Sequence, residues 1–285
     1  MPDVLHALPI LIPQLGYQEH RDYWQASGAV ITEYPSDNRA AMVTFIDCAI
    51  QQNARQHVLV INPNNPTGLL MGRTQLLQWA QQLGTEAYLM VDEAFIDTSP
   101  EESVLDEQLP DNVIVLRSFG KFFGLAGIRL GYCFAASAVL NRLRQRLGLW
   151  QMNGPAQAIA SQALNDISWQ QGMIPHLVDR MQQLQTWLEP LMLTVGGQRV
   201  LEGHPLFLSY TMTSQQAYSA SDFFARSGIL LRVIKTGCES QQEQNEEPQE
   251  EYALLRIGLC APEHDSRLQA TIEHAITYLS KVNHV

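Results

Sequence analysis

Short, uninterrupted apolar runs recur through the first two-thirds of the chain, separated by longer amphipathic stretches. Val58-Leu59-Val60-Ile61, the run over 87–91 and the run over 113–116 are the clearest of them. Strands that are buried on both faces, as in a parallel sheet, carry continuous Val, Ile and Leu in this way. Stretches between the runs, such as 74–83, have the apolar spacing of helices that cover a sheet. The alternation predicts an α/β fold with a mostly parallel sheet covered by helices.

The character of the sequence changes after Gly196-Gly197. Strand-like and helix-like segments follow in a different pattern, with strands expected over 205–212, 229–234 and 252–259 and helices over 218–226 and 263–279. This second pattern predicts a smaller α+β domain at the C-terminal end of the chain.

The length of 285 residues suits about two domains. We expect a large domain over 1–170, a connecting helix over 171–195 and a small C-terminal domain over 196–285. Pro175 is expected at the start of the connecting helix and not in its middle, because an interior proline removes a hydrogen bond from the helix.

Charge and composition exclude several classes of protein. The net charge is −11, from 29 acidic and 18 basic residues, which argues against general electrostatic binding to nucleic acid or anionic membranes. Apolar residues make up 46% and charged residues 16%, so the chain can bury a sizeable core. No apolar run approaches the roughly 18 residues of a membrane span. No Lys or Arg precedes the first apolar run, so we expect no signal peptide and a cytoplasmic location.

Cysteine and glutamate patterns add two further expectations. The four cysteines are scattered without a CxxC pair, and the sequence has no HExxH motif or Cys/His cluster, so we expect no metal site. Segment 239–251 contains six Glu and no apolar residue, which predicts a solvated surface loop.

Polar side chains follow three of the apolar runs, at the points where the predicted strands end. They lie in Asn62-Pro63-Asn64-Asn65-Pro66-Thr67-Gly68, in Asp92-Glu93-Ala94-Phe95, in Arg117-Ser118-Phe119-Gly120-Lys121, and in Gly124-Leu125-Ala126-Gly127-Ile128-Arg129. Ligands of open α/β sheets bind beyond the carboxyl ends of the strands, so these side chains can converge on one crevice. Taken singly, the first segment is also typical of a tight turn. Asp92 alone is also typical of a helix N-cap, and Lys121 alone of an ordinary surface lysine. The apolar neighbours of Lys121 nevertheless predict that it lies in a packed environment, where lysine is rare unless it has a functional role.

These segments together resemble a known family. The set NPNNPTG, DEAF, SFGKFFGLAGIRLG and a late LLRIGL is similar to the class I/II aminotransferase-like enzymes of fold type I, which use pyridoxal phosphate. Within that family the set resembles histidinol-phosphate aminotransferase, and DEAF and SFGKFFGLAG more closely resemble threonine-phosphate decarboxylase of cobalamin biosynthesis. The resemblance implies a lyase that decarboxylates the small amino-acid phosphate L-threonine O-3-phosphate, with an aminotransferase of the histidinol-phosphate type as the alternative.

The resemblance assigns three residues to the reactive part of the cofactor. Lys121 would form the internal aldimine through its amine, which must be deprotonated to act as a nucleophile. Asp92 would face the pyridine nitrogen and keep it protonated, which makes the ring a better electron sink. Asn65 would donate to the phenolic oxygen of the ring.

Five further residues match binding positions of the family. Ser118 and Arg129 would hold the cofactor phosphate with a hydroxyl donor and a guanidinium fork. Tyr17 matches the aromatic residue that stacks on the ring, and an amphipathic surface tyrosine is the alternative. Arg256 matches the arginine that grips the substrate carboxylate. Arg232 would meet a substrate phosphate or assist at the carboxylate, and its place on a strand-like run leaves an exposed-face arginine as the alternative.

The chain departs from the family pattern in three respects. Phe95 stands where many aminotransferases have a tyrosine that donates to the ring oxygen, and Gly120 where many have a second phosphate-binding serine. Family members also carry a leading segment with a Gly/Ser-rich phosphate loop, and no such loop precedes Asn62. We therefore expect that an N-terminal segment is missing, and a truncated, catalytically impaired family member is another alternative. The family also implies a homodimer.

Ser118-Phe119-Gly120-Lys121 also fits the S-x-x-K motif of serine acyl-transfer enzymes. Ser36-Asp37-Asn38 and Lys235-Thr236-Gly237 fit the companion motifs S-D-N and K-T-G. In those enzymes S-D-N follows S-x-x-K, whereas here it precedes it. The residues after Lys121 are also a poor start for a nucleophile helix, so a serine acyl-transfer enzyme is the remote alternative.

Overall fold

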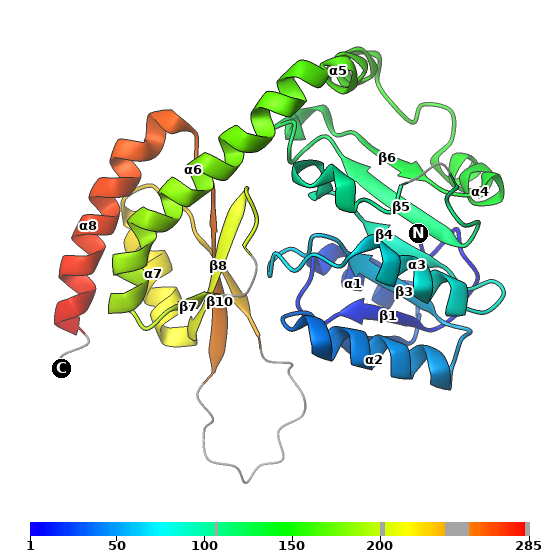
Figure 1. Ribbon diagram of the computed structural model, residues 1–285, viewed down its shortest axis with the longest axis horizontal. Coiled ribbons are helices and arrows are strands. Elements are labelled where there is room, and N and C mark those ends of the chain that lie inside the picture. The colour runs from blue at the N-terminus through cyan, green and yellow to red at the C-terminus, as the bar shows by residue number, and fades with distance from the viewer. Residues whose placement is uncertain (106–107, 200–202, 237–250, 283–285) are drawn as a thin grey trace, which may run out of the picture. The chain divides into compact units, whose positions relative to one another are not determined.

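A computed structural model describes residues 1–105, 108–199, 203–236 and 251–282 (Figure 1). The chain divides into two compact units, Met1–Gly172 and Met173–Val285. Residues 239–250 of the predicted acidic loop lie outside the described residues. Across the described ranges, we find no helix that combines the length and the apolar character of a membrane span.

A six-stranded sheet forms the framework of the first unit. Its strands lie in the order β2-β1-β3-β4-β5-β6, and every neighbouring pair is parallel except β5 and β6, which are antiparallel. The strands are β1 (Ile10–Pro13), β2 (Ile31–Tyr34), β3 (His57–Ile61), β4 (Leu89–Asp92), β5 (Val113–Ser118) and β6 (Gly131–Phe134). Every residue of β3 is buried, as expected for a strand covered on both faces. The mostly parallel sheet predicted from the apolar runs is confirmed.

Helices pack against both faces of this sheet. They are α1 (Gln18–Ala26), α2 (Arg39–Gln52), α3 (Arg73–Gln82) and α4 (Ser137–Leu147). The unit also contains α5 (Gly154–Asn165) and short 3-10 helices at Ile96–Thr98, Pro100–Glu102 and Ala126–Ile128. Trp79 of α3 packs in one buried cluster with Val60, and Trp24 of α1 packs in another with Leu59. Successive residues of a strand face opposite sides, so neighbouring residues of β3 reach separate cores.

The long helix α6 (Ile167–Thr194) contributes residues to both units and contains Pro175 in its interior. The expectation that Pro175 marks the helix start is therefore wrong. The helix starts earlier because Asp166 Oδ1 accepts a hydrogen bond from the backbone N–H of Trp169, at 3.0 Å, which caps the first turn. Proline removes one intrahelical hydrogen bond farther along, and buried leucines beyond it keep the helix packed.

The second unit contains a four-stranded antiparallel sheet in the order β7-β8-β10-β9. Its elements are β7 (Gln198–Arg199), β8 (Phe207–Thr213), α7 (Ser214–Arg226), β9 (Arg232–Lys235), β10 (Tyr252–Gly258), a 3-10 helix at Pro262–His264 and α8 (Asp265–Val282). Leu188 of α6, Phe224 of α7 and Leu255 of β10 share one buried core. The small α+β fold predicted for this part of the chain is confirmed.

Candidate active site

The carboxyl ends of β3, β4 and β5 meet along one edge of the first sheet. Ile61, Asp92 and Leu116 lie opposite one another in the parallel register. The backbone N–H of Asn62 donates to the Asp92 carbonyl at 2.8 Å, so the Asn-rich segment leaves the sheet directly beside Asp92. Ser118 ends β5, two residues beyond Leu116. The structure therefore places the Asn-rich segment, Asp92 and Ser118 at the same edge.

A buried hydrogen-bond network holds the loops at this edge. Asn64 Nδ2 donates to the Leu15 carbonyl at 2.9 Å and to Thr67 Oγ1 at 2.8 Å. Thr67 Oγ1 donates to the Ser36 carbonyl at 3.0 Å, and Ser36 Oγ accepts the Leu15 N–H at 2.9 Å. The network joins the loops after β1, β2 and β3. It fixes the loop on which Asn65 lies, half-buried, beside the sheet edge.

Two hydrogen bonds orient the carboxylate of Asp92. Its Oδ1 accepts the backbone N–H of Ala94 at 3.0 Å, and its Oδ2 lies 2.7 Å from His20 Nε2. An ionised carboxylate has about four acceptor sites, so Asp92 can still accept from another donor. Sequence patterns alone do not single out His20. Its position three residues after Tyr17, at the start of α1, is the available signal, because that spacing places two side chains on one helix face.

Tyr17 lies immediately before α1, in contact with His20. The two rings meet edge to face with their centroids 5.8 Å apart, and Tyr17 is 44% exposed. Partial burial raises the pKa of Tyr17, as do a hydrogen bond with Glu19 and the negative charge of Asp92, whereas Arg129 opposes the rise. Tyr17, Asp92 and Arg129 therefore lie within electrostatic reach of one another.

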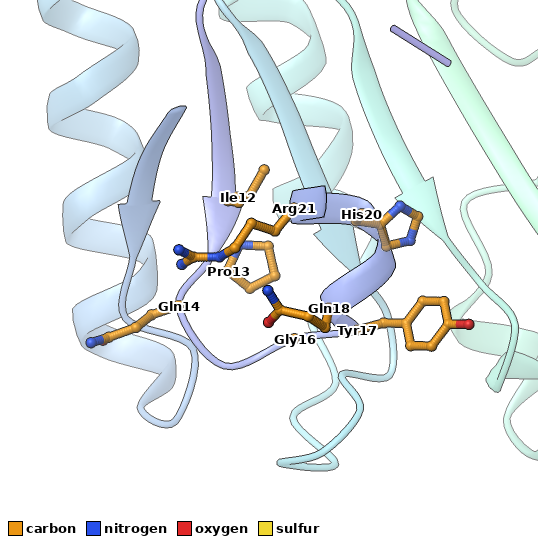
Figure 2. Close-up of a pocket in the computed structure, with 8 residues that line it drawn as sticks. All are labelled: Ile12, Pro13, Gln14, Gly16, Tyr17, Gln18, His20 and Arg21. Atoms are coloured by element: carbon orange, nitrogen blue, oxygen red, sulfur yellow. The ribbon is translucent and has the colours of Figure 1, made fainter. Parts of the chain in front are cut away.

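A small pocket beside Tyr17 is lined by α1 and by the loop after β1. Figure 2 shows Tyr17 and His20 on one side of this loop and the side chain of Gln14 on the other. A Cβ atom at Gly16 would come within 2.6 Å of the Pro13 side chain. Glycine is needed there because the backbone passes so close to Pro13, and this close approach sets the turn that carries Tyr17 to the sheet edge.

Lys121 lies in a tight turn that follows β5. The Lys121 carbonyl accepts the N–H of Gly124 at 3.0 Å, and the Phe119 carbonyl accepts the N–H of Leu125 at 3.0 Å. Gly124 has a φ of +67°, a left-handed conformation that glycine adopts without strain. These contacts close the turn over residues 119–125, which we call the lysine turn.

The side chain of Lys121 is exposed, so the expectation that it is packed is wrong. The apolar neighbours that motivated the expectation, Phe122 and Phe123, take the buried positions of the turn themselves. Lys121 Nζ lies 5.3 Å from the centroid of the Phe95 ring, over its face. The amine is therefore accessible and lies against an aromatic side chain that has no hydroxyl.

Ser118 and Arg129 flank the lysine turn. Ser118 is half-buried, and its Oγ accepts the N–H of Gly120 at 3.1 Å. A hydroxyl that accepts a hydrogen bond still has its own hydrogen to donate. Arg129 is exposed, and its Nη1 donates to the Ala126 carbonyl at 3.2 Å. A hydroxyl and a guanidinium on either side of a turn are donors suited to an anion.

A buried ionic cluster supports the same strand ends. Arg117 Nε lies 2.9 Å from Glu93 Oε2, and Arg117 Nη1 lies 2.8 Å from Asp97 Oδ1. Ser103 Oγ donates to Glu93 Oε2 at 2.7 Å. Burial raises the pKa of Glu93 and of Asp97, and the charge of Arg117 opposes both rises. Glu93 and Arg117 are sequence neighbours of two site residues named above, so the cluster fixes the backbone from which those residues project.

Two arginines lie on neighbouring strands of the second unit. Arg256 of β10 pairs with Arg232 of β9, and Arg232 is exposed. The Arg256 guanidinium lies 4.4 Å from the Phe207 ring centroid, and its Nε is buried with no hydrogen-bond partner among the described residues. Burial lowers the pKa of Arg256, and the charge of Arg232 adds to that effect. A buried donor that lacks a partner, next to a second cation, favours the binding of an anion.

The motifs behind the serine acyl-transfer alternative have structural roles. Lys121 lies in a turn and not in a helix that follows Ser118. Ser36 is 2% exposed and belongs to the buried loop network, while Asn38 caps the start of α2. Gly237 of the K-T-G motif lies outside the described residues.

The first unit has a mostly parallel sheet with a lysine, an aspartate and a tyrosine at one edge, and a small unit with an antiparallel sheet follows it in the chain. Together these features define an α/β fold of the aminotransferase type. The fold is similar to that of the histidinol-phosphate aminotransferase from Clostridium acetobutylicum, with a TM-score of 0.77 and 16% identity over 97% of this chain and 80% of that one. The chain belongs to the family described as aminotransferase class I and II, whose family model matches residues 5–242.

Curated relatives carry two different names. The chain is 34% identical over 248 residues to threonine-phosphate decarboxylase from Pseudomonas aeruginosa, which covers 87% of this chain and 66% of that protein. It is 36% identical over 146 residues to histidinol-phosphate aminotransferase 1 from Psychrobacter arcticus, which covers 49% of this chain and 37% of that protein. The chain therefore spans less than two thirds of the length of either relative.

Proposed function

We propose that this protein binds pyridoxal phosphate and, with it, decarboxylates L-threonine O-3-phosphate, the reaction that the resemblance connects with cobalamin biosynthesis. The observation that carries the proposal is the 34% identity with a threonine-phosphate decarboxylase over 87% of this chain. The proposal includes a homodimer, as the family resemblance implies.

The donor set of the first unit fits such a cofactor. Tyr17 presents a partly exposed ring for stacking, and Asp92 presents a carboxylate that two hydrogen bonds hold in place. Ser118 and Arg129 supply a hydroxyl and a guanidinium for a phosphate. Lys121 supplies an exposed amine. When bound, the cofactor would draw electrons from a bond at the substrate Cα, which is the chemistry that decarboxylation requires.

Three residues of the first unit would have separate roles in the reaction. Lys121 would hold the cofactor covalently through Nζ and deliver or remove a proton at the substrate Cα. Asp92 would hold a proton on the pyridine nitrogen. Asn65 would donate to the phenolic oxygen, a task that Phe95 cannot share because it has no hydroxyl.

The second unit would recognise the anionic groups of the substrate. Arg256, with its buried and unpartnered Nε, would bind the carboxylate, and Arg232 would bind the phosphate or assist at the carboxylate. In decarboxylation the bond from Cα to the carboxylate breaks, carbon dioxide leaves, and Cα gains a proton. By binding these anionic groups, the two arginines would set the orientation of the substrate.

The substrate proposal is tested by incubating the 285-residue protein with pyridoxal phosphate and L-threonine O-3-phosphate. We expect one carbon dioxide and one amino-alcohol phosphate for each substrate consumed, with no requirement for a keto acid. L-Threonine without the phosphate is the matched control and should react far more slowly. Carbon dioxide release is measured with carboxyl-labelled substrate, and the amine product by mass spectrometry.

The second candidate is amino transfer, which the 36% identity over 146 residues with a histidinol-phosphate aminotransferase supports. It is tested in the same mixture with histidinol phosphate and 2-oxoglutarate. Glutamate formation without carbon dioxide release would replace the decarboxylase proposal with an aminotransferase. An absence of both reactions, together with no cofactor absorbance, would point to the impaired family member.

Replacing His20 with phenylalanine should weaken binding of pyridoxal phosphate by about tenfold or more, because the Asp92 carboxylate would lose its hydrogen bond with the imidazole of His20. His20→Gln is the matched control, since its amide N–H can donate to the same oxygen. Fluorescence titration measures the affinity, and thermal unfolding shows that each variant is folded. Equal affinities for the wild-type protein and His20→Phe would mean that His20 does not orient Asp92.

A further inference from the structure

The guanidinium of Arg256 is held by an aromatic ring and not by a carboxylate. Its Cζ lies over the Phe207 ring, 4.4 Å from the centroid, and its buried Nε has no hydrogen-bond partner among the described residues. Burial and the charge of Arg232 both lower the pKa of Arg256, and no described carboxylate pairs with it. The positive charge of Arg256 is therefore not compensated within the part of the chain that the structure describes.

Two other mostly buried arginines of this chain are held differently. Arg117 Nε lies 2.9 Å from Glu93 Oε2, and Arg180 Nη2 donates to Asp265 Oδ1 at 2.8 Å. In each case a carboxylate compensates the charge and occupies N–H donors, which suits a structural role. The hydrogen bond with Asp265 also raises the pKa of Arg180, in the opposite direction to the shift at Arg256. The contrast indicates that the donors of Arg256 serve a ligand.

The register of the second sheet places Phe207 within reach of Arg256. Arg256 of β10 lies opposite Ser209 of β8 and opposite Arg232 of β9, so these three side chains share one face. Phe207 precedes Ser209 by two residues and lies on the same face, at a diagonal position that a long side chain can reach. The other face of β10, with Leu255, belongs to the buried core of this unit.

The Phe207 ring is itself firmly held. Phe207 and His204 exchange two backbone hydrogen bonds of 3.0 Å, and their rings stack with centroids 5.1 Å apart and an interplanar angle of 19°. His204 Nδ1 accepts the N–H of Leu206 at 3.1 Å, which fixes the orientation of the imidazole. Phe207 and His204 are both buried. Such packing leaves little rotamer freedom, so the Phe207 ring is a rigid support for the guanidinium.

We propose that Phe207 is a positioning residue for Arg256, whose guanidinium it holds in the orientation that binds an anionic group. The attraction between a cation and an aromatic face holds the guanidinium without occupying its N–H donors. The inference rests on the proposed function, in which Arg256 binds the substrate carboxylate. A phenylalanine that only fills space would contribute to folding and leave the anion affinity of Arg256 unchanged.

The test follows the Nε–H of Arg256 by nuclear magnetic resonance in the cofactor-free protein. Arginine labelled with nitrogen-15 at Nε gives one signal for each residue, and the signal lost in Arg256→Lys belongs to Arg256. In the wild-type protein the ring current of Phe207 should displace this signal from those of exposed arginines. Added L-threonine O-3-phosphate should move it further, and the titration gives a dissociation constant at this residue.

Phe207→Leu should return the signal toward those of exposed arginines and raise the dissociation constant about three- to tenfold, the effect of losing one cation–π contact. Phe224→Leu is the matched control, because Phe224 is a buried phenylalanine of the same unit that lies in the core on the other face of the sheet. It should keep the dissociation constant within about twofold of the wild-type value. Circular dichroism reports whether each variant is folded. If Phe207→Leu does not fold, Phe207→Met replaces it, because methionine fills the space without a ring.

A folded Phe207→Leu or Phe207→Met protein with the wild-type dissociation constant would overturn the inference. A wild-type signal that does not respond to L-threonine O-3-phosphate would also overturn it, because Arg256 would then not be open to an anion. Carbon dioxide release in the presence of the cofactor decides the proposed function separately. An intact titration at Arg256 without carbon dioxide release would remove the proposed function and retain the role of Phe207.

Discussion

Replacing Lys121 with alanine should abolish covalent attachment of pyridoxal phosphate and lower decarboxylation of L-threonine O-3-phosphate by about three orders of magnitude or more. The amine is the nucleophile of the site, and alanine offers neither a nucleophile nor a group that moves a proton at the substrate Cα. Loss of the visible absorbance band on adding the cofactor measures the first effect. Loss of carbon dioxide release measures the second.

The same substitution should leave the fold intact. Lys121 is exposed, so its removal should change the free energy of unfolding by no more than about 0.5 kcal/mol. Lys235→Ala is the matched control, because Lys235 is also exposed and lies on β9. Borohydride reduction followed by peptide mapping should place the label on Lys121 in the wild-type protein and in Lys235→Ala. Label retained on another lysine in Lys121→Ala would contradict the assignment.

Replacing Asp92 with asparagine should lower turnover by about a hundredfold or more, equivalent to roughly 3 kcal/mol. Asparagine has nearly the same shape and can still accept the Ala94 N–H, but it carries no negative charge to hold a proton on the pyridine nitrogen. Cofactor affinity should also fall by about tenfold or more, because the pyridine nitrogen would lose its charged partner. Steady-state rates and a cofactor titration separate the two quantities.

Asp47→Asn is the matched control for that experiment. Asp47 accepts a hydrogen bond from Trp79 Nε1 at 2.7 Å, and asparagine can accept the same bond. Its turnover should stay within about threefold of the wild-type value, since exposed or half-buried substitutions that keep their contacts have small effects. If both variants lose activity equally, the loss reflects the fold and not the charge of Asp92.

The sheet of the first unit could be predicted because its signal is local. A run such as Val58 to Ile61 shows that a strand is buried on both faces, and the amphipathic stretches show that helices cover it. The strand order and the antiparallel direction of β6 could not be predicted in the same way, because an apolar run carries no information about its neighbour.

The candidate site could be predicted in part for the same reason. Asp92 and Ser118 follow strands that are parallel neighbours, so their sequence positions already place them at one edge. His20 comes from a helix, and only tertiary packing brings it to Asp92. Its role therefore requires the structure.

The two corrected expectations have a common cause. Apolar neighbours suggested that Lys121 is packed, and the preference of proline for helix starts suggested that Pro175 begins a helix. In the structure the neighbours of Lys121 are buried instead of the lysine, and a cap at Asp166 starts the helix before Pro175. Both expectations treated a local preference as decisive where contacts elsewhere in the chain decided the outcome.

The buried network of Asn64, Thr67 and Ser36 has a consequence for the thermodynamics of ligand binding. Three loops are already immobilised by buried hydrogen bonds of the Asn64 and Thr67 side chains in the protein alone. The entropy cost of ordering these loops is therefore part of the free energy of folding and not of binding. A ligand that binds at the sheet edge does not have to order them. Association at this edge is expected to resemble the docking of a ligand onto a rigid surface, with little change in heat capacity from loop ordering.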